Sequence, residues 1–319
     1  MQQLLWRLSN QRELSLLVFI GFLVIVFAVT TPAMLSGGNV MDLLQNLVVI
    51  CLLTIGVLVV ILARGIDLSI GATMGFVTLL VGKLAVAGWP LWSLIIVGLA
   101  AGLIAGAING LLVTVVKLPP IIATLGTLSI YSGLMFVITK GQWITGVPKQ
   151  LTILGSFTIF GIPGRMIILG IIMLIVILFL QFSVLGRYIY AVGNNPKAAN
   201  LAGISDGPIV FVTYLIAGAT AAIAGILYVS YTGFTTPTMG IDMQMKAIAA
   251  AVIGGTSIFG GRGTPIGGFL GSVLLVMIAS SLVFYHLPAI WNKAAEGLII
   301  LIAVIADSAF ENKSQKLGR

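Results

Sequence analysis

The sequence predicts one all-α integral membrane domain with about ten transmembrane helices, and three observations support this fold class. Of its 319 residues, 59% are hydrophobic and only 8% are charged, whereas soluble domains carry roughly 25% charged residues. The mean hydropathy is +1.19, and the apolar residues fall into runs close to the ~20 that cross a bilayer as a helix. The 39 glycines also suit helices that approach one another closely inside a membrane.

Polar, glycine and proline breaks separate the apolar runs. The N-terminal segment has basic residues before its apolar run, as a signal peptide does, but no convincing small-residue cleavage site follows, so we interpret it as a retained helix. In chain order, the predicted spans cover about residues 14–31, 41–62, 68–87, 91–116, 121–138, 166–185, 209–231, 246–259, 264–284 and 294–307.

Two charges and a row of glycines mark the first half of the chain. Arg64 and Asp67 interrupt the apolar sequence between the second and third spans. Because they are three residues apart, we predict a structural charge pair on one helix face, with contact to a substrate as the alternative. The fourth span carries glycines at intervals of four, which lie on one helix face and predict a helix-packing surface. These glycines are Gly98, Gly102, Gly106 and Gly110.

The distribution of basic residues predicts the orientation in the membrane. Ten spans place both termini on one side, and ten basic residues then share that side: Arg7, Arg12, Arg64, Lys117, Arg187, Lys197, Arg262, Lys313, Lys316 and Arg319. Six remain for the opposite side: Lys83, Lys140, Lys149, Arg165, Lys246 and Lys293. Since cytoplasmic loops are enriched in Lys and Arg, we expect both termini to be cytoplasmic.

A polar stretch at residues 186–208, GRYIYAVGNNPKAANLAGISDGP, stands out from the apolar chain. The orientation above places it in the cytoplasm. Asn195 followed by Pro196 is typical of a helix N-cap and first turn, so we predict a short helix over 196–202 that Gly203 ends. The helix has a smooth apolar side suited to docking a partner, made of Ala198, Ala199, Leu201 and Ala202. The alternative is an ordinary linker.

A faint internal repeat relates residues 64–75 to residues 260–271. The two segments share Gly65/Gly261, Ile70/Ile266, Gly71/Gly267 and Gly75/Gly271 at constant offset. Each is a charged, glycine-containing break that leads into a new span. Repeated interrupted segments in the two halves of a membrane protein indicate a transporter core, although a glycine-rich chain also produces such matches by chance.

Uncharged polar residues within the spans are candidates for a translocation path. Gln45 and Asn109 lie inside the second and fourth spans, and Thr124 and Thr127 lie in the fifth. A path for a polar solute needs such groups, because hydrocarbon cannot satisfy its hydrogen bonds. The alternative is hydrogen bonding between helices.

The sequence offers few residues for catalysis or metal binding. It contains one histidine, His286, and one cysteine, Cys51, which lies in an apolar run. We therefore expect no catalytic residues, no metal and no cofactor on this chain. The basic residues are scattered, which argues against nucleic acid. A phosphate-binding loop is also missing, since Gly82-Lys83 is followed by Leu84. Any ATP used in transport must bind another chain.

Four segments resemble one known family. The polar stretch, ARGIDLSIG from Ala63, LPPIIATLGTLSIYSGL from Leu118 and AIAAAVIGGTSIFGGRGTPIGG from Ala247 are similar to permeases of bacterial ABC importers of the ribose, galactose and xylose type. GQWITGVP from Gly141 and LPAIWNK from Leu287 resemble the autoinducer-2 importer branch. The sequence departs from the family at Asn194, Arg64 and Ser132, positions where glycine, glycine and arginine are frequent.

The resemblance implies partners and a set of coupling residues. It implies a multi-pass protein of the bacterial inner membrane, a second permease in a homodimer or heterodimer, surrounding lipid, an extracytoplasmic solute-binding protein, and cytoplasmic ATPase subunits that use ATP and Mg. The solute would be autoinducer-2, with ribose, rhamnose or another monosaccharide as alternatives; a secondary carrier is the alternative class. The residues that would contact the ATPase are Gly186, Arg187, Tyr190, Gly193, Asn195, Pro196, Ala198 and Ala199.

Overall fold

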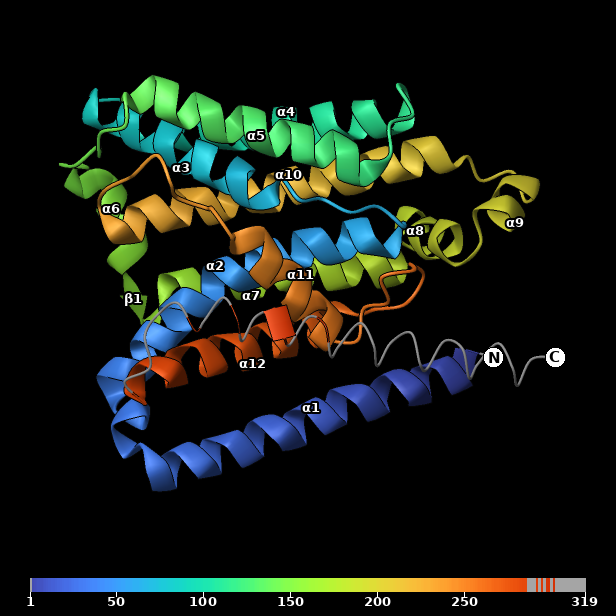
Figure 1. The fold of residues 1–319 in the computed structure, drawn as a ribbon, viewed down its shortest axis with the longest axis horizontal. Coiled ribbons are helices and arrows are strands. Elements are labelled where there is room, and N and C mark those ends of the chain that lie inside the picture. Colours follow the sequence, from blue (N-terminus) through green and yellow to red (C-terminus); the bar gives the residue numbers. More distant parts are fainter. Residues whose placement is uncertain (1, 286–290, 292–293, 295–296, 299–300, 302–319) are drawn as a thin grey trace.

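The computed structural model describes residues 2–285, 291, 294, 297, 298 and 301. These residues form a helical bundle with one small hairpin (Figure 1). The elements are α1 (Gln2–Thr30), η1 (Pro32–Leu35), α2 (Gly37–Leu62), α3 (Ile70–Val86), α4 (Leu91–Thr114), α5 (Pro120–Thr139), α6 (Lys149–Ser156), β1 (Thr158–Ile159), β2 (Ile162–Pro163), α7 (Gly164–Phe182), α8 (Val184–Asn194), α9 (Pro196–Leu201), α10 (Asp206–Thr232), α11 (Met243–Ile253) and α12 (Pro265–Phe284).

Seven of the described helices are long and apolar enough to cross a membrane: α1, α2, α4, α5, α7, α10 and α12. The predicted third and eighth spans are instead shorter apolar helices, α3 with 17 residues and α11 with 11. The predicted tenth span, at 294–307, lies largely outside the described residues, as do His286 and most of LPAIWNK. The total of ten spans and the direction of the chain in the membrane stay predictions.

Helix α2 forms the centre of the bundle. It packs against α7, α10, α11 and α12, and every residue from 47 to 63 is buried. A helix that is apolar all round belongs in such a position, because each of its faces meets another helix. By contrast, α1 lies along one side of the bundle (Figure 1) and only 6% of its apolar window is buried, which suits contact with lipid.

The four glycines of α4 lie at its contact with α10. A Cβ at Gly102 would overlap the backbone carbonyl of Gly218, and a Cβ at Gly106 that of Tyr214, both on α10. Gly98 and Gly110 face side chains of α10, those of Ile226 and Phe211. Removing the side chains lets the two backbones meet closely, which is how membrane helices gain packing energy without a hydrophobic driving force. We call this contact the glycine seam.

The short helices α3 and α11 begin inside the bundle. At about 1.5 Å per residue they extend roughly 25 and 17 Å, less than the ~30 Å hydrocarbon layer. Irregular segments lead into them, residues 63–69 before α3 and 233–242 before α11 (Figure 1). Both segments are largely buried. Irregular backbone inside a membrane is tolerated only where it is buried in protein or lines a water-filled cavity.

The two copies of the internal repeat make similar close contacts. Gly71 and Gly75 of α3 face the backbone at Met239 and Gly240, just before α11. Their counterparts on α12, Gly267 and Gly271, face the backbone of Gly254 and Ala250 at the end of α11. In both copies the glycines bring a helix against α11 or the segment that enters it.

The two ends of the bundle differ in structure. Helices α8 and α9 lie at the same end as the start of α1, whereas α6 and the β1–β2 hairpin lie at the opposite end (Figure 1). The region from Thr139 to Arg165, predicted on the outer face, therefore lies opposite the predicted cytoplasmic stretch.

Candidate coupling surface and solute path

The polar stretch at 186–208 contains most of α8, all of α9 and the first residues of α10. The predicted N-cap of the short helix is confirmed: the side-chain oxygen of Asn195 accepts a hydrogen bond from the Ala198 backbone nitrogen at 3.1 Å. Helix α9 then ends at Leu201, one residue earlier than predicted, and Gly203 adopts a positive φ of 81°, which favours glycine. The residues before α9, up to Asn194, form a further helix, α8, which the sequence analysis did not include.

Helix α8 was not predicted. Ser183 caps it by accepting a hydrogen bond from the Gly186 backbone nitrogen at 2.8 Å. Ile189 and Val192 are buried against the core, three residues apart on one helix face. Arg187 and Gly193 lower the average hydropathy of this segment, so its amphipathic pattern is not visible in a hydropathy profile. The pairing of Ile189 with Val192 is the signal that could have found the helix.

Half of the predicted ATPase-coupling residues face inward. Gly186 packs on the backbone of Leu180 in α7, and Gly193 packs on the Leu62 carbonyl at the end of α2. The Tyr190 hydroxyl donates to the Gly263 carbonyl at 2.8 Å, and Ala199 is buried. These four residues anchor α8 and α9 to the bundle. We therefore correct the prediction that they contact a partner.

The remaining coupling residues are accessible. Arg187, Asn195 and Ala198 are exposed and Pro196 is half-buried. Leu201, which the sequence placed on the apolar side of the short helix but not among the ATPase-contacting residues, has a side chain that is 92% exposed. It lies on a helix that projects from the end of the bundle (Figure 1). An exposed leucine beside Ala198 forms a small apolar tip, which we call the α9 tip.

The predicted charge pair between Arg64 and Asp67 is wrong. The Arg64 guanidinium donates to the Gly193 carbonyl at 2.7 Å and to the Asn194 carbonyl at 3.0 Å. Asp67 is buried, with 2% of its surface exposed, and accepts hydrogen bonds from Ser69. Arg64 has a positive φ of 65°, so the helical geometry that would bring the two side chains together ends before Asp67.

Arg64 belongs to a junction where both break segments meet the end of α8. Two more hydrogen bonds lie beside those of Arg64. The Gly261 backbone nitrogen donates to the Leu62 carbonyl at 2.9 Å, and the Tyr190 hydroxyl donates to the Gly263 carbonyl. We call these residues the coupling junction: Leu62, Arg64, Tyr190, Gly193, Asn194, Gly261 and Gly263. Burial raises the pKa of Tyr190 to about 12, so its hydroxyl stays a hydrogen-bond donor at neutral pH.

A buried polar network fixes the start of α3. The Oδ1 atom of Asp67 accepts from the backbone nitrogen and hydroxyl of Ser69 at 2.8 and 2.7 Å. Ser69 in turn accepts from the Asn109 amide at 2.7 Å, and Asn109 accepts from the Thr127 hydroxyl at 2.7 Å. Burial raises the pKa of the Asp67 carboxyl, while hydrogen bonds from Ser69 oppose the shift. The carboxyl caps the positive end of a helix.

The predicted path residues take part in interhelical hydrogen bonds. Asn109 and Thr127 join the network above, and Thr124 donates to the Ile66 carbonyl at 3.3 Å, so these three meet around the segment before α3. Gln45 lies elsewhere and accepts a hydrogen bond from Arg165. Arg165 is 1% exposed, and its guanidinium carbon lies 3.8 Å from the centre of the Tyr231 ring.

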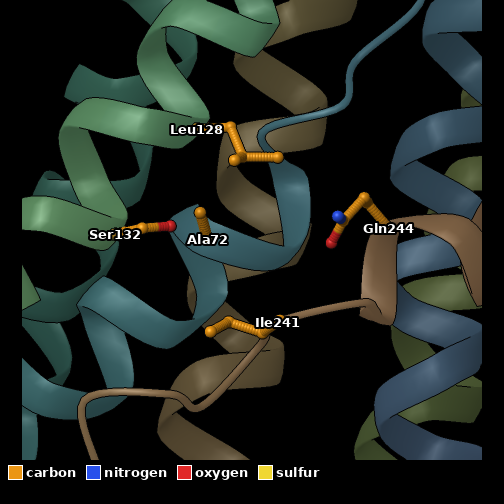
Figure 2. Close-up of a pocket in the computed structure, with 5 residues that line it drawn as sticks. All are labelled: Ala72, Leu128, Ser132, Ile241 and Gln244. Carbon is orange, nitrogen blue, oxygen red and sulfur yellow. The ribbon is translucent and has the colours of Figure 1, made fainter.

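A cavity of about 160 Å³ lies between α3, α5 and the start of α11, lined by Ala72, Leu128, Ser132, Ile241 and Gln244. Figure 2 shows Ser132 pointing from α5 toward Ala72 and the Gln244 amide pointing from α11 toward α3. None of the predicted path residues lines it. The sequence signal was the spacing of Ser132 four residues after Leu128, which places both on one face of α5.

The described residues contain no group of three or more His, Cys, Asp or Glu side chains that could hold a metal ion. Their chemistry is that of hydrogen bonding and helix packing. The fold is that of a multi-pass membrane transport protein. It combines membrane-length helices, the two short helices α3 and α11 that start inside the bundle, which we call half-helices, and the amphipathic α8 with α9 at one end.

The chain belongs to the family described as branched-chain amino acid transport system, permease component, whose sequence profile matches residues 39–304. It is similar to the autoinducer 2 import system permease protein LsrC of Enterobacter sp. (strain 638), with 39% identity over 94% of this chain and 88% of the relative. The proteins of the same name from Escherichia coli O9:H4 (strain HS) and Salmonella typhi are each 36% identical over 94% of this chain, covering 88% and 86% of the relatives. No solved structure matches the chain.

Proposed function

We propose that this chain is the membrane-spanning subunit of an ATP-driven importer that carries autoinducer-2 across the bacterial inner membrane. It would work as a dimer with a second permease, and separate cytoplasmic subunits would hydrolyse ATP with Mg. The observation that carries the proposal is the similarity, at 36–39% identity over 94% of the chain, to permeases named for autoinducer-2 import.

The geometry of α8 and α9 supports coupling to an ATPase. The exposed α9 tip offers a partner a small apolar contact, and the anchoring residues tie the same unit to α2 and to the segment before α12. A displacement of α9 would be transmitted through backbone contacts to the segments before α3 and before α12, with no long flexible loop in between. Such a rigid connection suits the transfer of motion from one subunit to another.

The opposite end of the bundle supports docking of a solute-binding protein. The rings of Trp143 and Phe234 stack with centroids 5.5 Å apart and planes at 7°, and Trp143 is 66% exposed. Next to them, Ile144 and Thr235 exchange two backbone hydrogen bonds of 2.9 Å. Exposed aromatic rings on a hydrogen-bonded support are frequent at protein interfaces. The same Phe234 lies on the segment that enters α11.

Uptake by living cells tests the proposed solute. Cells that lack this chain and cells that express it, each with the other importer subunits, are given labelled autoinducer-2 or labelled ribose. We expect the chain to restore uptake of autoinducer-2 and leave uptake of ribose unchanged. Restoration of ribose uptake alone would refute the solute and retain the transport class. Counterflow by the purified chain alone in liposomes would instead identify a secondary carrier.

A further inference from the structure

The cavity at the start of α11 contains an unsatisfied polar group. Gln244 is 8% exposed, and its side-chain oxygen Oε1 has no hydrogen-bond partner. A buried acceptor without a partner is destabilising, so such groups are rare in folded proteins and need an explanation. Oε1 itself is covered and lies against Gly71 of α3. Rotation of the side chain would turn the amide toward the cavity, where a hydroxyl of a ligand would satisfy it.

The first turn of α11 adds backbone donors to the same place. Asp242 is the N-cap residue, but its side chain does not cap the helix. The first amide groups of a helix lack intrahelical acceptors and attract hydrogen-bond acceptors or partial negative charge. Helix α3 also faces the cavity, through Ala72, and has a buried carboxyl at its start: Asp67 accepts hydrogen bonds from Ser69, the N-cap residue, which in turn accepts one from Asn109.

The lining residues define the chemistry of the ligand. None of the five is ionisable, two carry polar groups, Ser132 and Gln244, and the other three are apolar. Pockets for drug-sized ligands are roughly 300–1,000 Å³, so a cavity of about 160 Å³ suits a smaller molecule. A small neutral solute with several hydroxyl groups and an apolar ring face matches this lining.

The cavity is also connected to the coupling junction. Gly71, Gly75 and Gly240 hold the start of α3 against the segment that enters α11. The chain runs from the far end of α11 at Ile253 through a loop to Gly261 and Gly263, which bond to Leu62 and Tyr190. A shift of α8 would therefore be transmitted along this 11-residue helix to the wall that carries Gln244.

We propose that this cavity is the solute subsite of the permease, and that the Gln244 amide, turned from Gly71 toward the cavity, accepts a hydrogen bond from a hydroxyl of a small neutral furanose-like solute while Ser132 contacts it from the opposite wall. The proposal rests on the transport function above. It makes Gln244 a specificity-determining residue and assigns to the α11 half-helix the task of opening and closing the subsite.

The first test replaces Gln244 by leucine in the complete importer and measures the initial rate of autoinducer-2 uptake. We expect Gln244→Leu to lower the rate about tenfold, the effect of one lost hydrogen bond of ~1.4 kcal/mol, while membrane abundance and the ATP hydrolysis of the assembled importer stay near wild type. Gln181→Leu, on an exposed position of α7, is the matched control. Equal rates for the two variants would overturn the subsite.

A second test does not depend on removing Gln244. Cys51 is the chain's one cysteine, so Ser132→Cys in a Cys51→Ala background gives a single reporter thiol, and Ser129→Cys gives its exposed control on α5. We expect a small hydrophilic thiol reagent to inhibit uptake through Cys at 132 and autoinducer-2 with loaded binding protein to slow that labelling. Labelling at 132 that solute does not alter would contradict the proposal. Absence of uptake by the wild-type importer would instead refute the transport function.

Discussion

Asp67 shows how a charge predicted from sequence changes its meaning in the structure. The sequence suggested a structural charge pair with Arg64 on one helix face, yet the carboxyl is buried and bonds Ser69 at the start of α3. Its partner Ser69 is held by Asn109, and Asn109 by Thr127, and these two residues lie roughly 40 to 60 positions later in the chain. A local pattern contains no information on such distant partners, whereas the N-cap at Asn195 is predictable because its acceptor and donor are three residues apart.

Asp67→Asn tests the buried carboxyl through pH. Burial raises the pKa of Asp67 in the folded protein, so its contribution to stability is full below the unfolded pKa of about 3.9 and is lost as the pH rises through the folded pKa. We expect thermal unfolding of the detergent-solubilised wild type to lose stability as the pH rises above the unfolded pKa of about 3.9, and Asp67→Asn to flatten this dependence. Asp206→Asn, at an exposed position, is the control. Parallel curves for wild type and Asp67→Asn would contradict this assignment.

The two hydrogen-bond partners of Arg64 lie 129 and 130 residues later in the chain, so local sequence patterns do not reveal them. We expect Arg64→Ala to lower solute uptake severalfold while ATP hydrolysis by the assembled importer is kept, because the guanidinium holds the end of α8 to α2. Charge-assisted hydrogen bonds to carbonyls are stronger than neutral ones, so Arg64→Lys should retain part of the uptake. Full uptake by Arg64→Ala would show that the junction does not depend on this contact.

At the scale of elements, the long spans were predictable to within a few residues because apolar runs directly define membrane helices. The starting points of the half-helices α3 and α11 were harder to predict. Their breaks are visible in sequence at Arg64 and Gly240, but the depth at which α3 and α11 begin depends on packing against Met239 and Gly240. Helix α8 was missed because hydropathy alone does not detect an amphipathic helix.

The glycine seam between α4 and α10 makes a prediction about packing. Gly106→Val would force a side chain into the Tyr214 carbonyl, and overpacking of this kind costs about 1–3 kcal/mol. We expect a lower unfolding temperature and reduced membrane abundance. Gly126→Val on α5, where a Cβ meets nothing within 4 Å, is the matched control. Equal stability of the two variants would contradict the seam's role.

The α9 tip makes a prediction about assembly. Leu201→Glu places a charge at the centre of an apolar contact, and removing one interface anchor commonly costs about 2 kcal/mol or more of binding. We expect loss of ATPase co-purification and of uptake, with the permease still in the membrane, and near-normal assembly of Leu201→Met. Retained ATPase binding by Leu201→Glu would exclude the tip as a contact.

At the scale of the whole molecule, one chain of contacts crosses the bundle. The α9 tip lies at one end, the coupling junction follows, and α11 leads from the junction to the cavity. From there the segment through Gly240 reaches Phe234 and Trp143 at the opposite end. The family resemblance predicted the two ends of this route, and the structure supplies its interior.

ATP-dependent transport by the reconstituted importer tests the central claim most directly. The purified permease dimer, its ATPase subunits and loaded binding protein are placed in liposomes with ATP and Mg available only to the ATPase, and labelled autoinducer-2 is supplied on the opposite side. The account predicts accumulation that requires ATP, the binding protein and this chain, and that Leu201→Glu abolishes. Accumulation by this chain without ATPase or ATP would contradict it.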